Sequence, residues 1–484
     1  MALGAMLVAG AAAPAFAASQ IDFKGWYRIH QMNDWNQNYD TDKDLASDDT
    51  GYFINRLNLD FTFNATDEVA VYWRVRGPAS ERWGSSNIGL ISQWLYGEVK
   101  TDAGTFSIGK LANDFTYLGL ANLGHSLTYV DGDTAYGYGS PFDVDAPSSG
   151  IRWANSWDGG FQLVAQFTRL ATAENSKYIE TDPGSAGPPV VPPSGIYQVS
   201  PETHDLFILQ PAYLWDGGGA TLALIYERDH VGDGDDWDFN ATPNPKKSGG
   251  VNDPAWKGYF VNPAVSHSFG DFTVNFEGKA GWGKAPDEKG EDEKDKGYAF
   301  YLDFDYNYGP GNVTLAGWWA SGSKDGDDKM NDLVDFGSFA PFLVAYNTGD
   351  WNLGYYEGTA TSRKNTKSRT NAIATANELS GTGGGPTGMA NHMALALMGA
   401  HAFTDDVTLQ YGLGYLSLNQ AQKGKKKDIG YEGDLGVKVQ LLDNVSFTTN
   451  FGYLMAGKAL EIEENGTKKK EDAYSWYNTL TFSF

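Results

Sequence analysis

Cysteine is absent from this 484-residue chain, and basic residues are scarce beside acidic ones. Without cysteine the chain has no disulfide scaffold, no thiolate metal site and no cysteine nucleophile. The 36 Lys and Arg against 61 Asp and Glu give a formal net charge of −25 at pH 7. Because nucleic-acid binding depends on clustered basic side chains that neutralise phosphates, this balance argues against a nucleic-acid partner.

Long hydrophobic runs and catalytic motifs are missing as well. Beyond the N-terminal segment the longest apolar run is residues 339–346, well short of the roughly 20 residues that a helix needs to cross a membrane. The 7 histidines include no i, i+4 pair of a zinc helix, and no G-x-S-x-G nucleophile elbow occurs. Because no Ser/His or paired-carboxylate constellation can be assembled, we expect that the protein is not an enzyme.

Two acidic stretches offer oxygen ligands for a cation. One holds Asp233 and Asp235, the other Asp325 and Asp327, and carboxylates are ligands that calcium prefers. Neither stretch completes the spacing of a calcium-binding loop. A solvated loop is therefore the favoured interpretation, and no cofactor is expected.

The N-terminus has the pattern of an export signal. Residues 3–13 form an apolar stretch, and Ala15-Phe16-Ala17 supplies an A-x-A cleavage site. No Lys or Arg precedes the apolar stretch, which departs from the usual signal. We expect residues 1–17 to be removed and residues 18–484 to form a single domain.

Alternation of apolar and polar residues is the dominant pattern of that domain. It runs without a fault through residues 56–64, resumes at residues 69–76, and recurs to the end of the chain. Strict alternation indicates β-strands with one polar and one apolar face.

Short and long connections alternate between these strands. Tight turns on one side and long loops on the other predict an all-β transmembrane antiparallel up-and-down β-barrel, with short periplasmic turns and long outer loops. Eight turns join sixteen strands, and the first and last strands bring the number to 18; 16 or 20 strands stay open. The apolar run 339–346 is interpreted as a loop packed on itself and not as a further strand. The eight turns lie at residues 66–68, 102–104, 157–160, 215–218, 269–271, 309–312, 403–406 and 442–444.

Arginine is the most informative residue type. Of ten arginines, seven precede residue 170. Residue parity places five of them on the polar, lumen-facing side, near mid-height of the barrel, where they would line the pore as a basic wall. The alternative for each is a structural pairing with a lumen carboxylate such as Asp60 or Glu98. The five are Arg28, Arg56, Arg74, Arg76 and Arg152.

The end of the chain and its aromatic residues fit the same interpretation. Aromatic residues flank the short turns, as they do at a membrane interface. The last residues, which include Phe482 and Phe484, resemble the assembly signal of bacterial outer-membrane proteins. We therefore expect the barrel assembly machinery as a partner. The basic runs 423–427 and 468–470 are candidates for contact with outer-membrane lipid and lipopolysaccharide.

Together these features resemble the trimeric outer-membrane porins of Gram-negative bacteria, and most of all the homotrimeric porins of sulfate-reducing bacteria. The resemblance is carried by residues 56–76, 151–168 and 430–453 and by Phe484. It implies a homotrimer in the outer membrane through which small hydrophilic solutes and ions diffuse passively. Two alternatives stay open: a channel selective for sugars or small carboxylates, and a secreted β-rich carbohydrate-binding protein.

The resemblance also draws attention to residues 111–149, where trimeric porins fold a loop into the lumen. This stretch holds Asp114, Asp131 and Asp133 and has no Lys or Arg. An acidic loop facing the arginine wall would create a transverse field across a constriction.

Overall fold

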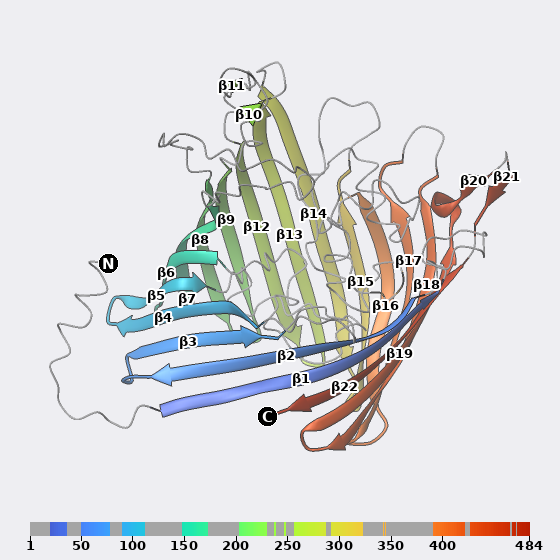
Figure 1. Cartoon of the computed structure of the whole chain (residues 1–484), viewed down its shortest axis with the longest axis horizontal. Helices are drawn as coiled ribbons and strands as arrows, with labels where there is room; N and C mark the ends of the chain where they lie inside the picture. The colour runs from blue at the N-terminus through green and yellow to red at the C-terminus, as the bar shows by residue number, and fades with distance from the viewer. Residues whose placement is uncertain are drawn as a thin grey trace, which may run out of the picture.

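In the computed structural model, most of the described strands form one barrel-shaped sheet (Figure 1). The structure describes residues 20–35, 50–77, 90–111, 148–172, 203–229, 237–238, 246–247, 256–286, 292–322, 342, 344, 391–421, 426–464, 467–470 and 472–484.

The main sheet has 18 strands, all paired with their neighbours in antiparallel fashion. It closes on itself, because β1 pairs with β2 on one edge and with the last strand, β22, on the other. Two small hairpins, β10–β11 and β20–β21, stand outside it. The strands are β1 (Gln20–Trp35), β2 (Thr50–Asn64), β3 (Val69–Arg76), β4 (Ile91–Thr101), β5 (Gly104–Leu111), β6 (Ser148–Ser156), β7 (Phe161–Thr172), β8 (Thr203–Trp215), β9 (Gly218–Asp229), β10 (Trp237–Asp238), β11 (Lys246–Lys247), β12 (Trp256–Phe269), β13 (Phe272–Pro286), β14 (Asp292–Asn307), β15 (Gly311–Ala320), β16 (His392–Ala402), β17 (Val407–Leu418), β18 (Asp428–Leu442), β19 (Val445–Ala456), β20 (Ile462–Glu464), β21 (Thr467–Lys469) and β22 (Ala473–Ser483).

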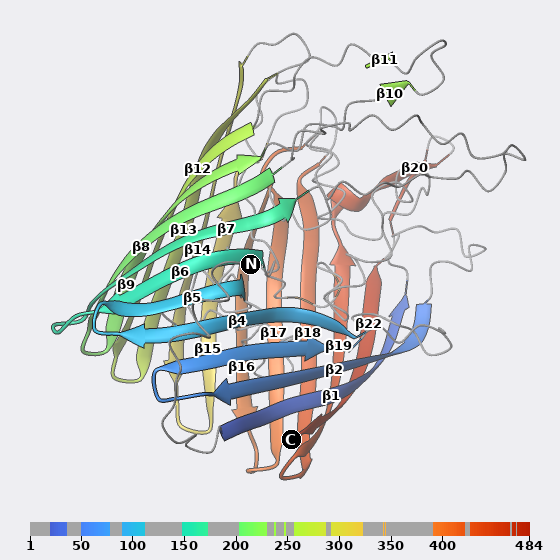
Figure 2. The same ribbon diagram turned by 60° about the vertical axis from the view of Figure 1, so that its left-hand side comes forward.

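The strands are strongly inclined to one another around the barrel. β12–β14 rise steeply, whereas β1–β4 lie across the lower part of the molecule (Figure 1). Turned to bring that side forward, the molecule shows β1–β4 in front and β15–β19 behind them (Figure 2). No helix in the described part of the chain is long and apolar enough to span a membrane.

The predicted fold class, the strand number of 18 and the eight short turns are confirmed. Several turns depend on glycine in a left-handed conformation: Gly217, in the two-residue turn between β8 and β9, has φ +77°, and Gly270, between β12 and β13, has φ +65°. Glycine adopts this region without the steric cost that a Cβ atom would add.

Side chains alternate strictly between the two faces of the wall. In β16, Leu395 and Leu397 are 59% and 44% exposed, whereas Ala394, Ala396 and Met398 are buried on the other face. A closed barrel with large apolar side chains on its outer face fits hydrocarbon and not water. The sheet therefore has the architecture of a transmembrane barrel, and its polar positions face the lumen.

Two rows of aromatic side chains border the apolar belt, which is the band of large apolar side chains on the outer face of the barrel. One lies beside the short turns and includes the exposed rings of Phe161 and Phe272. The other row lies nearer to the opposite ends of the strands. It includes Phe167, six residues after Phe161 in β7, and Trp282, ten residues after Phe272 in β13. With about 2.5 Å of height per tilted residue, the rows are roughly 15–25 Å apart. This spacing suits the two interfaces of one membrane.

Some strands extend further than the alternation predicted. β13 continues to Pro286 and β14 begins at Asp292, so both strands reach into the strongly charged stretch 284–296. Backbone pairing continues there, from Trp282–Lys296 to Pro286–Asp292. Beyond the membrane a strand needs no apolar outer face, so its hydrogen bonds persist where the sequence alternation stops.

Candidate functional site: a charged lumen

Three of the predicted arginines are buried on the inner face of the wall. Arg28, Arg74 and Arg152 lie in β1, β3 and β6, and each is at most 5% exposed. Ile151, which directly precedes Arg152 and therefore points to the opposite, outer face, is 51% exposed. The sequence alternation that makes the strand amphipathic thus brings these guanidinium groups to the lumen side.

The other two predicted arginines lie in neighbouring strands. Arg56 in β2 is opposite Arg28 in the β1–β2 register. Arg76 in β3 is opposite Asn58 in the β2–β3 register. The side chains of Arg56 and Arg76 lie outside the described part of the structure.

The described arginines are held against the wall by pairing and stacking. Arg74 forms a two-pronged ion pair with Asp60, in which Nη2 lies 2.6 Å from Oδ2. Its guanidinium carbon also lies 3.8 Å from the ring centre of Trp94, and that of Arg28 lies 3.9 Å from Trp26. The Arg74–Asp60 ion pair is the structural pairing that the sequence offered as the alternative to a pore-lining arginine. Because Asp60 neutralises Arg74, the net positive charge of this wall is lower than that of a row of unpaired arginines.

The next strands continue this polar surface. Arg152 Nε donates to Gln166 Oε1 at 2.8 Å. Glu98, the other carboxylate offered as an arginine partner, instead accepts from the hydroxyls of Tyr72 and Ser107, each at 3.4 Å. Tyr72 in turn stacks on Tyr96, with ring centres 5.0 Å apart. Aromatic faces and charged groups thus share one side of the lumen.

A second charged wall, which is acidic, lies on β13 and β14. Glu277, Asp303 and Asp305 are buried on the inner face. Asp303 accepts from Asn275 Nδ2 at 2.9 Å, and Asp305 accepts from Thr314 Oγ1 at 2.6 Å. Hydrogen bonds from neighbouring strands thus fix the positions of these carboxylates.

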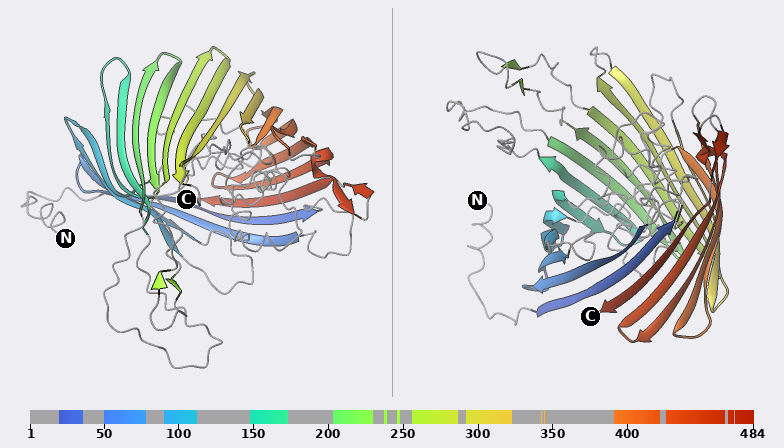
Figure 3. Two further views of the ribbon diagram at one scale, coloured as in Figure 1. Left: turned by 90° about the horizontal axis from the view of Figure 1, so that it is seen from above. Right: turned by 45° about the vertical axis from the view of Figure 1, so that its right-hand side comes forward.

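The two walls face each other across the barrel. In the ring of 18 strands, β3 and β14 are nine strands apart, which is half of the circumference. Viewed from above, β1–β3 (blue) lie across the ring from β13–β15 (yellow) (Figure 3, left). Arg74 is five residues from the short-turn end of β3, and Asp303 is four residues from that end of β14. Opposite charges on facing walls, four to five residues from the short-turn ends of their strands, would create a field across the lumen.

The acidic wall was not predicted, although the sequence of β14 carries its signal. Asp303 and Asp305 alternate with Leu302 and Phe304 in β14, and the same parity argument that placed the arginines would have placed these carboxylates inside.

One part of the lumen is filled by apolar side chains from the connection between β15 and β16. Phe342 and Val344 are fully buried. The Phe342 ring lies 6.1 Å from that of Trp318 and packs where Gly414 has no side chain. The backbone N–H of Val344 donates to the carboxylate of Glu432. Trp318, Gly414 and Glu432 belong to the inner face of β15, β17 and β18.

This packing corrects the interpretation of residues 339–346 as a loop packed on itself. The described residues of that run, Phe342 and Val344, pack against the barrel wall. The wall admits them because its inner face there is built from small residues such as Ala316 and Ala396. A large apolar ring can therefore approach the backbone closely.

The terminal aromatic residues lie where the barrel closes. Phe484 exchanges two backbone hydrogen bonds with Gly25, at 2.8 and 3.0 Å. Its ring, half exposed, lies 5.6 Å from Phe23, and the ring of Phe482 lies 6.3 Å from Tyr27. Both aromatic residues therefore sit on the seam between β22 and β1.

Several predicted features lie outside the described residues. They are the proposed signal 1–17, most of the loop 111–149, and the residues Asp114, Asp131, Asp133, Asp233, Asp235, Asp325 and Asp327.

No protein-family model matches this chain, and no curated protein matches it. Among solved structures it is similar to OmpT, an outer membrane protein of Vibrio cholerae, with 13% identity, a TM-score of 0.39, and coverage of 98% of this chain and 100% of that one. It is similar to OprD from Pseudomonas aeruginosa, with 11% identity, a TM-score of 0.49, and coverage of 98% and 99%. It is also similar to an anion-selective porin from Comamonas acidovorans, with 11% identity, a TM-score of 0.42, and coverage of 96% and 100%.

Proposed function

We propose that this chain forms a water-filled channel in the outer membrane of a Gram-negative bacterium and lets small hydrophilic solutes and ions diffuse passively. The observation that carries the proposal is the pair of oppositely charged walls, Arg74 facing Asp303, inside a barrel whose outer face is apolar. Charged inner walls suit the passage of polar solutes, and an apolar belt suits lipid. The short turns face the periplasm and the opposite end faces the medium.

The electric field between the two charged walls determines which solutes and ions pass through the lumen easily. A polar solute aligns its dipole across the lumen, whereas a simple cation and a simple anion each meet one attractive and one repulsive wall. Because Arg74 is paired with Asp60, neither sign dominates at this height. We expect weak ion selectivity.

A second candidate is a channel selective for sugars or small carboxylates. It is favoured by the guanidinium–indole stacks Arg28–Trp26 and Arg74–Trp94 and by the stacked pair Tyr72–Tyr96. Flat aromatic faces beside N–H donors suit a pyranose ring, and guanidinium groups suit a carboxylate. A secreted, soluble carbohydrate-binding protein is disfavoured, because the outer face carries exposed leucines such as Leu395 and Leu413.

The remaining assignments extend the channel proposal. Residues 1–17 would be removed on export, and three copies would assemble as a homotrimer of the kind found in sulfate-reducing bacteria. The seam residues Phe482 and Phe484 would present the last strand to the barrel assembly machinery. Arg28, Arg56, Arg74, Arg76 and Arg152 would line the pore, opposed by Asp114, Asp131 and Asp133 of the loop 111–149 folded into the lumen.

Conductance of the detergent-purified protein in planar bilayers tests the channel. We expect ohmic current, in steps of three if the homotrimer forms. Saturable block of this current by one solute class would favour the selective channel. Protein that inserts into the bilayer as a β-barrel and carries no current would refute both candidates.

A further inference from the structure

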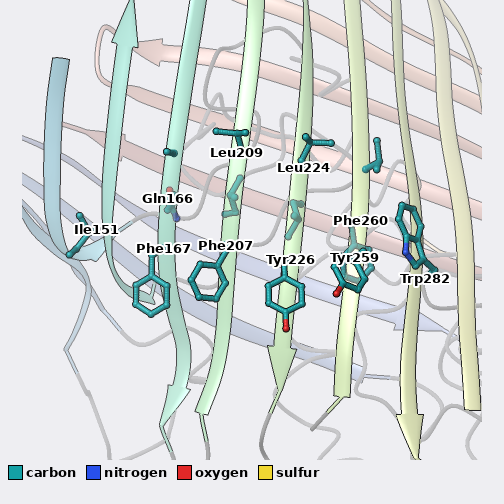
Figure 4. Close-up of a pocket in the computed structure, with 14 residues that line it drawn as sticks. Ile151, Gln166, Phe167, Phe207, Leu209, Leu224, Tyr226, Tyr259, Phe260 and Trp282 are labelled. Carbon is teal, nitrogen blue, oxygen red and sulfur yellow. The ribbon is translucent and has the colours of Figure 1, made fainter. Parts of the chain in front are cut away.

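A groove crosses the outer face of the barrel over β7, β8, β9 and β12 (Figure 4). Its volume is about 720 Å³, and apolar side chains dominate its lining. The small side chains of Ala165 and Val261 lie at the two ends of a cross-strand row in this lining, and the larger Leu209 and Leu224 form its middle. A hollow of this kind on the lipid-facing side offers more contact to an acyl chain than a flat wall does.

A row of rings borders the groove. The ring centres of Phe167 and Phe207 are 5.0 Å apart, those of Phe207 and Tyr226 5.9 Å, those of Tyr226 and Tyr259 5.1 Å, and those of Tyr259 and Trp282 6.2 Å. Figure 4 shows the first four rings along one line, with the Tyr226 hydroxyl pointing away from Leu224. This row belongs to the aromatic border farther from the short turns.

A row of charges lies two residues beyond these rings. Arg169, Asp205, Arg228 and Lys257 are cross-strand partners in successive strands, and they follow the outward parity of the rings. Asp205 is almost fully buried between Arg169 Nε at 2.8 Å and Arg228 Nη2 at 3.2 Å. These three cations and one carboxylate leave a net charge of +2. Exposed Lys296, opposite Trp282, adds another cation.

We propose that this face binds a phosphorylated lipid of the outer leaflet, with acyl chains in the groove and phosphate on Arg228, Lys257 and Lys296. The assignment rests on the proposed outer-membrane orientation. Charge complementarity carries it: the cations stand at the headgroup level, directly above an apolar groove, and Asp205 compensates only one of the two arginines beside it. A second copy of the chain docked here would have to place carboxylates opposite Lys257 and Lys296.

Native mass spectrometry of the full-length protein in detergent tests the headgroup contact. The probes are a hexa-acylated lipid A with two phosphates and the same lipid after dephosphorylation. The variant K257Q/K296Q leaves the Arg169–Asp205–Arg228 cluster intact, and K100Q/K110Q on β4 and β5 is its charge-matched control. Each surface cation contributes about fivefold to anionic-lipid affinity, so K257Q/K296Q should bind the phosphorylated lipid roughly 30-fold more weakly. The control should bind it like the wild type.

Three outcomes would overturn the headgroup assignment. They are equal wild-type affinity for the two lipids, an unchanged affinity in K257Q/K296Q, and an equal loss in the control. Lipid binding and conductance are measured in separate experiments. If the wild type conducts but does not prefer the phosphorylated lipid, only the lipid inference is refuted. A wild type that binds the lipid and carries no current refutes the channel alone.

The groove is tested by Ala165→Trp, which fills it from the lipid-facing side. We expect weaker binding of both lipids in A165W and an unchanged oligomeric state. If A165W binds both lipids normally while its oligomer dissociates, a second copy of the chain occupies the groove, and the lipid assignment is wrong.

Discussion

Neutralising either member of the Arg74–Asp60 pair should shift ion selectivity in opposite directions. Arg74→Gln leaves Asp60 without its ion-pair partner and makes the lumen one unit more negative, whereas Asp60→Asn makes it one unit more positive. The two groups are in direct contact, with Nη2 and Oδ2 2.6 Å apart. A passing ion therefore experiences them at nearly the same distance, and the double variant R74Q/D60N should have selectivity close to that of the wild type.

The size of the shift follows from Coulomb's law with screening. An ion that passes about 10 Å from a unit charge in water interacts with it by about 0.4 kcal/mol. At 0.01 M salt the Debye length is about 30 Å, which leaves about 0.3 kcal/mol, and at 1 M it is about 3 Å, which leaves almost nothing. Cation concentration then rises by about 1.6-fold and anion concentration falls by the same factor, so R74Q should raise the cation-to-anion permeability ratio roughly threefold at low salt.

The reversal potential in a potassium chloride gradient centred near 0.01 M measures this ratio. Arg169→Gln is the matched control, because Arg169 also pairs with a carboxylate, Asp205, but on the outer face of the barrel. R169Q changes the total charge equally and should leave the reversal potential unchanged. If R74Q and R169Q behave alike, Arg74 does not border the conduction path, and the charged-lumen proposal fails at that position.

Four further predictions test the barrel and its lumen. Unheated protein should migrate differently from boiled protein on SDS gels, because a closed barrel satisfies its backbone groups internally and resists detergent; identical migration would contradict the closed barrel. Deleting Phe484, which pairs with Gly25 at the seam, should reduce heat-modifiable protein in outer-membrane fractions without reducing export, and unchanged levels would refute this. Phe342→Ala should increase single-channel conductance, since a fully buried ring leaves the lumen; equal or lower conductance would show that this ring does not narrow the path. Glu277→Gln with Asp303→Asn should move the reversal potential towards anions at low salt, and no movement would exclude the acidic wall from conduction.

The sequence was sufficient to predict the fold because each strand carries its own signal. Alternation over residues 56–64 defines both the strand and its two faces. Short turns are equally local, as Asp216-Gly217 shows, because one left-handed glycine sets the hairpin. Antiparallel neighbours along the chain then leave little freedom in topology. Strand ends beyond the membrane, such as residues 283–286, could not be predicted, since backbone pairing alone holds them.

The lumen was harder to predict, because its contacts join residues far apart in the chain. Parity gives the face of Arg74, but not its ion pair with Asp60 or its stacking on Trp94. The burial of Phe342 against Gly414 depends on a connection returning to strands more than 70 residues away, and no local pattern encodes that return.

The overall charge of −25 is a poor guide to ion choice in such a molecule. Charges in the outer connections that lie farther than about 10 Å from the path are largely screened at 0.1 M salt. If the inner walls border the conduction path, as proposed, their charges lie nearer to a passing ion and are screened less. In the described lumen, the apolar packing around Phe342 occupies part of the space beside β15–β18, and the charged walls of β3 and β14 border another part. A few inner side chains, and not the acidic surface, should therefore set the selectivity, so neutralising one of them should matter more than removing several acidic residues from the outer loops.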